Sequence, residues 1–411
     1  MSARFSDPNN LEEQSDGFSQ ALSGLNSAAI NLDVVGNNIA NSQTVGFKGA
    51  STQFADVYTG AMAGQGVRVA AVLQDFSNGT LESTGRNLDL AINGGGFFRF
   101  QQGEEIVYSR NGQLSLTSDG YLENAQGARL TGFPAGVGTG GQPETLQVPA
   151  GAMAAVATTA VQGSFQMDAT ADTIDRGTTP FDATDGDTYS YANTGTAYDS
   201  LGVQHTMTTY FTKTADNTWE VRVALDGTAD TTNVGELVFD GNGVLDETAS
   251  TLPTYAFTPG GGADPMNFDI DFDGTTQFGN GFAMDTRTQN GSAAGSLVGI
   301  TFDETGNIIG NYSNEKSQAL GTIALANFRN PEGLEMAGDN AWVETGTSGQ
   351  PLLGLAGEGQ FGGLESGTIE KSNVDLTSEL VDLIVAQRNY QANTQTIKVQ
   401  DEVLQSAVNL R

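Results

Sequence analysis

Residues 18–39 read FSQALSGLNSAAINLDVVGNNI, and this stretch decides how the fold begins. Its apolar residues recur in steps of three and four, interrupted only at Gly36: Phe18, Leu22, Leu25, Ala29, Leu32 and Ile39. This is the spacing of a coiled coil, so the pattern predicts an amphipathic helix with these residues on one side. Ser15 and Asp16 can cap its start. The run of Asn and Gly at 36–41 predicts its end.

The C-terminus carries a second stripe with this spacing, which is longer and more polar: Leu376, Leu380, Leu383, Gln387, Tyr390, Thr394, Ile397 and Leu404. Asn373 and Asp375 precede it as capping residues, while Glu379 lies early and Lys398 late, as the helix dipole favours. Neither helix has a helical neighbour in sequence to cover its stripe. We therefore expect the two helices to pack on each other or on neighbouring copies. Docking on the chain's own β-structure is the alternative.

The residues between the two helices indicate β-structure. Alternating segments beside Gly pairs and Asn-Gly turns, such as 88–92 and 97–100, predict β-hairpins. Strand-like segments at 206–213 and 219–225 suit an antiparallel sandwich or barrel. Short segments with turns like those before residue 154 return after Gly295, which indicates that one β-domain is split by another inserted into it. The predicted fold class is α+β and mostly β, with terminal helices forming a coiled-coil-like domain and two β-rich domains, the central one inserted into the other.

These patterns also predict domain boundaries. The terminal helical domain comprises residues 17–47 and 371–411, and residues 48–83 form a connecting segment. A split β-rich middle domain comprises 84–154 and 297–370, and the inserted β-rich domain comprises 155–296. Residues 1–16 are polar, and we expect them to be a disordered extension.

Composition excludes several classes of partner. The chain has 411 residues and a formal net charge of −32. Nucleic acid and anionic membrane surfaces require a basic footprint, so neither is an expected partner. No apolar run approaches the roughly 20 residues of a membrane span, and residues 1–20 lack the order of a secretory signal. The absence of cysteine excludes disulfides, thiolate nucleophiles and zinc–thiolate sites.

A secreted hydrolase is the main alternative class. The sole histidine, His205, lies in a strand-like segment, and a Ser/His/Asp triad or a multi-histidine metal site would require it. Paired carboxylates could support glycoside chemistry, but the sequence singles out no pair. Asp269–Gly274 matches the opening of a calcium loop, yet its twelfth position is Asn280 rather than Glu, which favours a strand leading into a turn. Gly94–Gly96 lacks the Lys and Ser/Thr of a phosphate-binding loop. We therefore predict no enzymatic activity, no cofactor and no metal.

An adhesin is the second alternative, because the aromatic residues at 97–100 could mark a carbohydrate-binding surface. A buried strand pair is the favoured interpretation of the same residues. Helices with heptad spacing at both chain ends are not expected of an adhesin. That feature separates the two classes.

Three stretches resemble the rod and hook family of bacterial flagellar axial proteins. The first is 31–41 (NLDVVGNNIAN) with 44–48 (TVGFK). The second is 84–92 (TGRNLDLAI) with 96–98 (GFF) and 108–112 (YSRNG). The third is 372–376 (SNVDL) with 379–381 (ELV) and 386–393 (AQRNYQAN). The resemblance covers both ends and the split β-domain.

Within this family, rod-type members have much less sequence between the terminal helices, whereas hook-type members carry an inserted domain. Residues 310–315 (GNYSNE), 325–328 (LANF) and 332–334 (EGL) also resemble the hook type. The resemblance therefore implies a structural subunit of the flagellar hook. Its copies would polymerise into a curved flexible tube, a universal joint that transmits torque from the motor and rod to the filament and encloses an export channel. The helical domain would form the inner core, the split β-domain the middle and the inserted domain the outside.

The helical spacing and the resemblance together give a set of predicted subunit-packing residues: Phe18, Leu22, Leu25, Leu32, Asn37, Asn38, Ile39, Asn41, Leu376, Leu380, Leu383, Gln387, Tyr390, Ile397 and Leu404. The implied partners are further copies of the chain in a helical homopolymer, the flagellar rod, the hook cap, the hook–filament junction proteins, the hook-length-control protein and the flagellar type III export apparatus. The implied location is the extracellular hook on the basal body, reached without a cleaved signal peptide. Family members usually start near residue 17, so residues 1–16 depart from the pattern.

Overall fold

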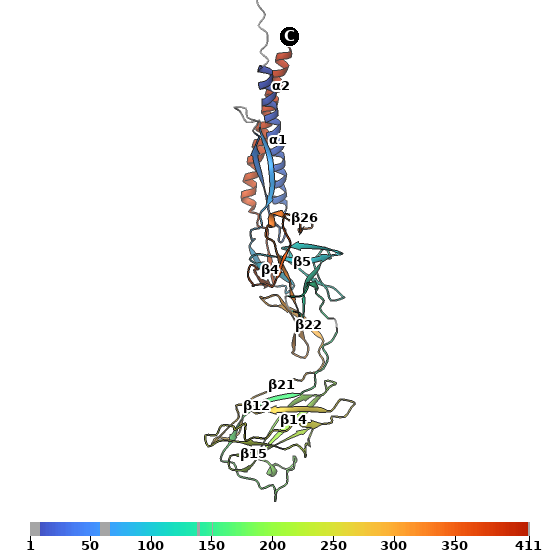
Figure 1. The fold of residues 1–411 in the computed structure, drawn as a ribbon, viewed down its shortest axis with the longest axis vertical. Coiled ribbons are helices and arrows are strands. Elements are labelled where there is room, and N and C mark those ends of the chain that lie inside the picture. Colours follow the sequence, from blue (N-terminus) through green and yellow to red (C-terminus); the bar gives the residue numbers. More distant parts are fainter. Residues whose placement is uncertain (1–8, 58–65, 138–139, 150, 410–411) are drawn as a thin grey trace, which may run out of the picture. The chain divides into compact units, whose positions relative to one another are not determined.

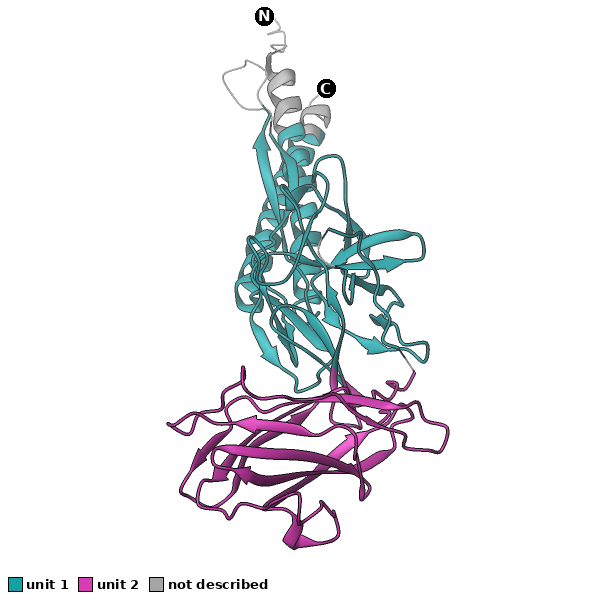
Figure 2. Ribbon diagram, turned by 60° about the horizontal axis from the view of Figure 1, so that its bottom comes forward, with its two compact units in different colours: residues 1–150, 300–310, 318–411 teal, residues 151–299, 311–317 magenta. Residues whose placement is uncertain are grey.

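The computed structural model describes residues 9–57, 66–137, 140–149 and 151–409. It confirms the predicted fold class, because α-helices lie at the two chain ends and most other elements are strands. The chain forms two compact units (Figure 2). Unit 1 comprises residues 1–150, 300–310 and 318–411, and unit 2 comprises residues 151–299 and 311–317. Neither of the α-helices in the described residues is long and apolar enough to cross a membrane.

The two terminal helices run antiparallel and side by side in unit 1 (Figure 1). Helix α1 spans Asn9–Ala40 and helix α2 spans Leu376–Asn409. Near the end of α1, Asn38 Nδ2 donates to Glu379 Oε1 at the start of α2, at 2.9 Å. About halfway along the pair, Gly24 faces Asn393. The helices from the two ends of the chain are therefore in contact from the Asn38 end to their middle.

The ends of the helices agree only partly with expectation. Helix α1 begins at Asn9, so the expected disorder of residues 1–16 is wrong for residues 9–16, where Leu, Glu and Gln favour a helix. Residues 1–8 lie outside the described residues. The predicted cap of α2 is confirmed, because Asp375 Oδ1 accepts hydrogen bonds from the backbone amides of Thr377 at 2.8 Å and Ser378 at 3.3 Å.

A β-hairpin follows α1 and packs along it. Strands β1 (Ala50–Asp56) and β2 (Val67–Gln74) pair antiparallel, and Ser27 Oγ on α1 donates to the carbonyl of Val67 at 3.3 Å. Strand β3 (Leu81–Ser83) then pairs with β30 (Thr368–Glu370), the strand that precedes α2. Residues 48–83, the expected connecting segment, thus contain a hairpin that packs along α1 and a strand that pairs with the strand before α2.

Most strands of unit 1 belong to one thirteen-stranded sheet with the main order β22-β23-β24-β10-β5-β6-β27-β26. Its members are β5 (Phe97–Gln102), β6 (Glu105–Ser109), β8 (Ser115–Leu116), β9 (Leu122–Glu123), β10 (Arg129–Pro134), β11 (Glu144–Thr145), β22 (Leu297–Phe302), β23 (Asn307–Tyr312), β24 (Ser317–Ile323), β25 (Leu325–Asn327), β26 (Glu335–Gly338), β27 (Ala341–Val343) and β28 (Leu352–Gly354). A smaller sheet has the order β29-β4-β7, with β4 (Asp89–Asn93), β7 (Gly112–Gln113) and β29 (Gly363–Ser366). A short 3-10 helix, η2, spans Pro331–Gly333.

Aromatic side chains form a buried cluster in unit 1. Phe97 and Trp342 are at most 2% exposed, and the Tyr108 and Phe328 rings meet edge to face with centroids 4.8 Å apart. The residues at 97–100 that could have marked a carbohydrate surface lie in this interior: Phe97, Phe98 and Phe100 are buried. The expected buried strand pair is confirmed, because β5 pairs with β6.

Unit 2 contains two five-stranded sheets. One has the order β18-β19-β12-β20 with β21 on β12, and the other has the order β13-β14-β15-β16 with β17 on β15. The strands are β12 (Ala160–Asp168), β13 (Tyr191–Tyr198), β14 (Gln204–Ala215), β15 (Thr218–Leu225), β16 (Thr228–Ala229), β17 (Gly235–Val238), β18 (Tyr255–Phe257), β19 (Met266–Asp271), β20 (Thr276–Phe278) and β21 (Ala283–Gln289), with a 3-10 helix η1 at Gly186–Thr188. One hydrophobic core joins them, with the rings of Phe165 and Phe211 5.0 Å apart.

The sequence suits an antiparallel sandwich or barrel, but the sheets of unit 2 also contain parallel strand pairs. Strand β12 pairs in parallel with β19 along its first half and with β20 along its second half. The calcium-like motif is a strand leading into a turn, as expected: residues 269–271 end strand β19, with Ile270 buried and both aspartates exposed, and a turn follows at 273–274. The described residues hold no group of three or more His, Cys, Asp or Glu side chains placed to bind a metal ion.

His205 lies on β14 with a carboxylate at each ring nitrogen. Its Nδ1 is 2.7 Å from Asp226 Oδ2, and its Nε2 is 3.3 Å from Asp199 Oδ2. Burial of the ring opposes protonation, but the hydrogen bonds and charges of the two carboxylates outweigh it and raise the pKa of His205 above its usual value. The ring therefore holds the turn after β13 and the turn after β15 to strand β14.

We expect the stability of unit 2 to fall as the pH rises through the raised pKa of His205. The folded pKa exceeds the unfolded one, so the contribution is complete below about pH 6.5 and is lost above it as the folded ring deprotonates. Urea unfolding followed by Trp219 fluorescence, in a Trp342→Phe background, measures this unit. His205→Gln should flatten that part of the pH profile. Equal slopes in both proteins would contradict the assignment.

Candidate functional site: the junction between the helix pair and the β-structure

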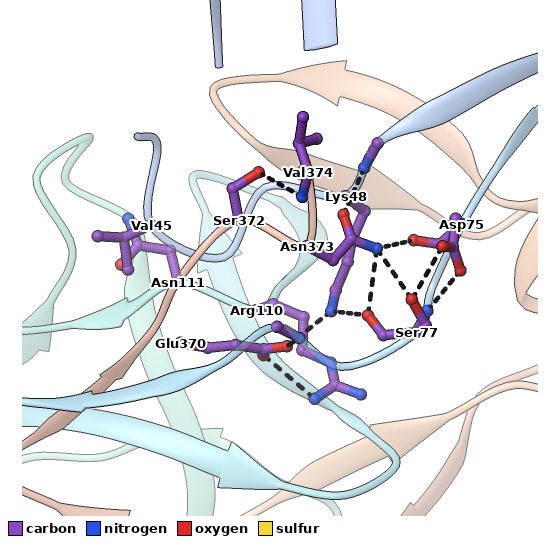
Figure 3. A network of polar contacts seen from close by, with 12 residues as sticks. Val45, Lys48, Asp75, Ser77, Arg110, Asn111, Glu370, Ser372, Asn373 and Val374 are labelled. Carbon is purple, nitrogen blue, oxygen red and sulfur yellow. Dashed lines mark hydrogen bonds and ion pairs between the residues drawn. The ribbon is translucent and has the colours of Figure 1, made fainter. Parts of the chain in front are cut away.

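Three separate segments of unit 1 meet where the helix pair joins the β-structure. The segment after α1 contributes Lys48, the loop between β6 and β7 contributes Arg110, and the end of β30 contributes Glu370 (Figure 3). These positions lie in or beside the three stretches that carry the family resemblance. One residue in or beside each of the three stretches therefore meets at this junction.

Glu370 is the centre of this junction. Its Oε1 is 2.7 Å from Lys48 Nζ and its Oε2 is 3.3 Å from Arg110 NH1, and all three side chains are at most 3% exposed. The backbone amide of Gly79 also donates to Glu370 Oε1 at 2.8 Å, and Lys48 Nζ donates to the carbonyl of Ser77 at 2.6 Å. Both carboxylate oxygens thus have partners from segments far apart in sequence.

The junction buries two positive charges, on Lys48 and Arg110, around the carboxylate of Glu370. Burial lowers the pKa of Lys48 and of Arg110 below their usual values, while the negative charge of Glu370 opposes that shift in both. The guanidinium of Arg110 also lies 5.3 Å from the centroid of the Phe97 ring. Because a buried carboxylate and its cations are stable only together, loss of one member leaves an uncompensated charge in the interior.

Two asparagines connect the junction to the helices. Asn373 Oδ1 accepts from the backbone amide of Gly49 at 2.8 Å, and its Nδ2 donates to the carbonyl of Asp75 at 2.8 Å. The Asn38 side chain makes two hydrogen bonds with the backbone of Ala50, as a neighbouring strand would. Its Oδ1 accepts from the Ala50 amide at 3.0 Å, and its Nδ2 donates to the Ala50 carbonyl at 2.8 Å. These side chains hold β1 against the end of α1 and the segment before α2, so both helices leave the β-structure in fixed positions.

The contact between the two helices uses a row of small side chains. The facing residues of α1 follow three-four spacing along Ala21, Gly24, Ala28, Asn31, Val35 and Asn38, and Ala386 of α2 is 1% exposed. A Cβ added at Gly24 would lie 2.9 Å from Asn393 Nδ2, so the helices approach closely there. We call this row the small-residue seam.

The predicted subunit-packing residues lie mostly outside this seam. Seven are exposed: Phe18, Leu22, Asn37, Leu376, Leu380, Gln387 and Tyr390. Six are half-buried: Leu25, Leu32, Ile39, Asn41, Leu383 and Ile397. Asn38 is 2% exposed and belongs to the seam, and the side chain of Leu404 lies outside the described residues. The structure thus gathers the exposed apolar members on faces of α1 and α2 that the helix pair leaves open, and their role between subunits stays a prediction.

Sequence reasoning did not single out Lys48, Arg110 and Glu370. Lys48 and Arg110 were quoted within the resembling stretches, but no local pattern shows that they converge on a carboxylate 322 and 260 residues away. The available signal was their rarity, because the chain has only 17 Lys and Arg residues.

Family descriptions match the chain in four parts. Residues 19–48 match "Flagella basal body rod protein", and residues 91–167 match "Flagellar hook protein FlgE/F/G D1 domain". Residues 166–292 match "Flagellar basal body protein FlaE D2 domain", and residues 365–410 match "Flagellar basal body rod FlgEFG protein C-terminal".

Relatives that align along almost the whole chain are flagellar hook proteins. The chain is 46% identical to flagellar hook protein FlgE of Escherichia coli strain K12 over 96% of this chain and 100% of the relative. It is 47% identical to FlgE of Salmonella typhimurium over the same shares. The crystal structure of Helicobacter pylori flagellar hook protein FlgE2 shares the fold, with a TM-score of 0.53 and 14% identity over 69% of this chain and 99% of that one. The chain therefore belongs to the flagellar hook protein FlgE family.

Proposed function

We propose that the chain is the structural subunit of a bacterial flagellar hook, whose copies polymerise into a curved flexible tube. The tube acts as a universal joint that transmits torque from the rod to the filament and provides a central export channel. The observation that carries this proposal is the division of the terminal helices into two kinds of face. Small side chains line the contact between the helices, whereas several large apolar side chains, among them Phe18, Leu22 and Leu380, remain exposed.

The open faces are well suited to contacts between copies. Phe18 and Leu22 on α1 are 41% and 43% exposed, and Leu380 on α2 is 45% exposed. Contiguous apolar surface on a soluble subunit marks an interaction site. A contact between two different faces of identical copies generates a helical filament when the rotation from one copy to the next does not close into a ring.

We also propose a layered arrangement within the tube. Residues 17–47 and 371–411 form the inner core, the split β-domain of 84–154 and 297–370 forms the middle, and 155–296 forms the outside. A tube that bends while rotating needs outer contacts that exchange, and polar surfaces exchange more easily than interdigitated apolar ones. The sequence of the inserted domain, rich in Thr, Asn and Asp, supports this arrangement.

The buried junction supports a role in transmitting force. Torque passing from the inner helices to the β-structure must cross the segments around Lys48 and Glu370. Buried charge pairs with several hydrogen bonds have defined geometry, and a change of partner would leave a charge unpaired. We infer that the junction keeps the helix pair and its β-structure together while the polymer bends.

The same proposal covers partners, location and the absence of catalysis. The partners are the rod, the hook cap, the hook–filament junction and hook-length-control proteins, and the flagellar type III apparatus, which would export the chain without a cleaved signal peptide. The location is the extracellular hook on the basal body. The non-enzymatic assignment is supported by His205, because both of its ring nitrogens are occupied by Asp199 and Asp226.

We expect Leu22→Asp and Leu380→Asp each to abolish tube formation while leaving the monomer folded. Each substitution places a charge on an open apolar face that polymerisation would bury. Negative-stain electron microscopy under polymerising conditions measures tubes, and circular dichroism measures the fold. Leu201→Asp, at a leucine that is 58% exposed in unit 2, is the matched control and should still form tubes. Tubes from all variants, or from none including the wild type, would count against the proposal.

We expect Glu370→Gln to destabilise unit 1 by about 3–5 kcal/mol, because Lys48 and Arg110 would keep buried charges without their carboxylate. Urea unfolding of the monomer, followed by Trp342 fluorescence in a Trp219→Phe background, measures the loss. Glu82→Gln is the control, since Glu82 pairs with Lys371 where both side chains are about half exposed, and should cost at most about 1 kcal/mol. A similar small cost for both variants would refute the structural role of the junction.

A further inference from the structure

A groove lies on the side of α1 that faces neither α2 nor the large apolar stripe. One turn-spaced row on α1, Ile30, Asp33, Val34 and Asn37, lines a pocket of about 270 Å³. Its other walls come from the β-structure and include Met336, which is 63% exposed. A second pocket of about 340 Å³ shares Asn37 and Met336 and extends the first. The two form one groove, which we call the α1 groove.

The floor of the α1 groove is apolar and accessible. Val72 of β2 is 48% exposed and Ile30 is 41% exposed, while Phe47 is buried beneath them. This composition fits the apolar side of a helix, which docks through residues at i, i+3, i+4 and i+7. Helix α2 of the same chain packs on the small-residue seam, so a helix that occupies the groove has to come from another molecule.

Helix α2 carries a face of that kind on the side away from α1. Val381, Ile384 and Val385 are 56%, 51% and 49% exposed, and Arg388 completes the i, i+3, i+4, i+7 row. Ala386, which is buried against α1, lies on the opposite side of the helix. We call the row of four the outer face of α2.

The charges of the groove and of the outer face are complementary. Asp33 is the only charged residue between positions 18 and 40, and it is exposed at the groove. Arg388 is exposed at the end of the apolar row on α2. Within the described residues neither side chain forms an ion pair. Asp33 and Arg388 carry opposite charges, and each lies beside an apolar surface. The two surfaces are therefore complementary in charge.

We propose that the α1 groove receives the outer face of α2 from a second copy of this chain, with Arg388 of that copy paired to Asp33. This inference rests on the proposed function, since it names the faces that meet in the polymer. The contact joins two different surfaces of identical molecules, so it can repeat from copy to copy and build the helical polymer of the proposed function. It also covers Val381, Ile384 and Val385, which the monomer leaves in water.

Charge exchange in the full-length chain tests the pairing. Asp33→Arg and Arg388→Asp each replace attraction by repulsion across the contact, and each should raise the critical concentration for polymerisation about fivefold to tenfold. The double variant restores opposite charges and should return it to within about twofold of the wild type. Sedimentation of polymer at low salt measures the critical concentration, and thermal melting of the monomer checks the fold.

The controls are charge reversals of equal size away from both helices. Lys316→Asp and Glu247→Arg change exposed residues of unit 2, so each should change the critical concentration less than about twofold. Polymerisation that is unaffected by the single variants, or a double variant worse than either, would overturn the pairing while leaving the proposed function intact. Failure of the wild-type chain to polymerise at all would overturn both.

Discussion

The close approach of α1 and α2 along small side chains is the constraint on which the rest of the structure depends. Gly24 against Asn393 and Asn38 against Glu379 fix the two helices antiparallel. The seam consists of Ala, Gly, Asn and Val, and beside it Leu25, Leu32 and Leu383 are only half-buried. Phe18, Leu22 and Leu380 remain exposed in the monomer. The same contact that completes the subunit therefore creates the surfaces by which we propose that subunits assemble.

The buried junction extends this constraint into the β-structure. Glu370 can be satisfied only when the segment after α1, the β6–β7 loop and the segment before α2 are all in place. Asn38 and Asn373 add hydrogen bonds from each helix to the neighbouring backbone. A charged centre of this kind contributes geometry more than net stability, because removal of charge from water offsets most of the attraction. Defined geometry is what a subunit under torque requires.

The sequence predicted the elements better than it predicted their faces. Residues 18–39 contain two rows with three-four spacing, one of large apolar residues and one of small residues, offset around the same helix. Either row predicts a helix from its periodicity, but a search for hydrophobic residues finds the row of large ones. Helix α2 instead packs on the row of small residues, which allows the two helices to approach closely. The junction was not predictable because Lys48 and Glu370 are 322 residues apart. The parallel pairings of β12 likewise depend on long-range contacts that no local pattern records.

We expect the seam to be closed before assembly and the exposed apolar faces of the helices to be covered only by assembly. The chain has no cysteine, so single substitutions Leu22→Cys, Leu380→Cys and Ala28→Cys can be labelled without background. Thiol alkylation rates, measured on monomer and on polymer, distinguish the two kinds of face. Labelling at positions 22 and 380 should be fast in the monomer and slow in the polymer, and labelling at position 28 should be slow in both. Fast labelling at position 28 in the monomer, or unchanged labelling at 22 and 380 in the polymer, would contradict this expectation.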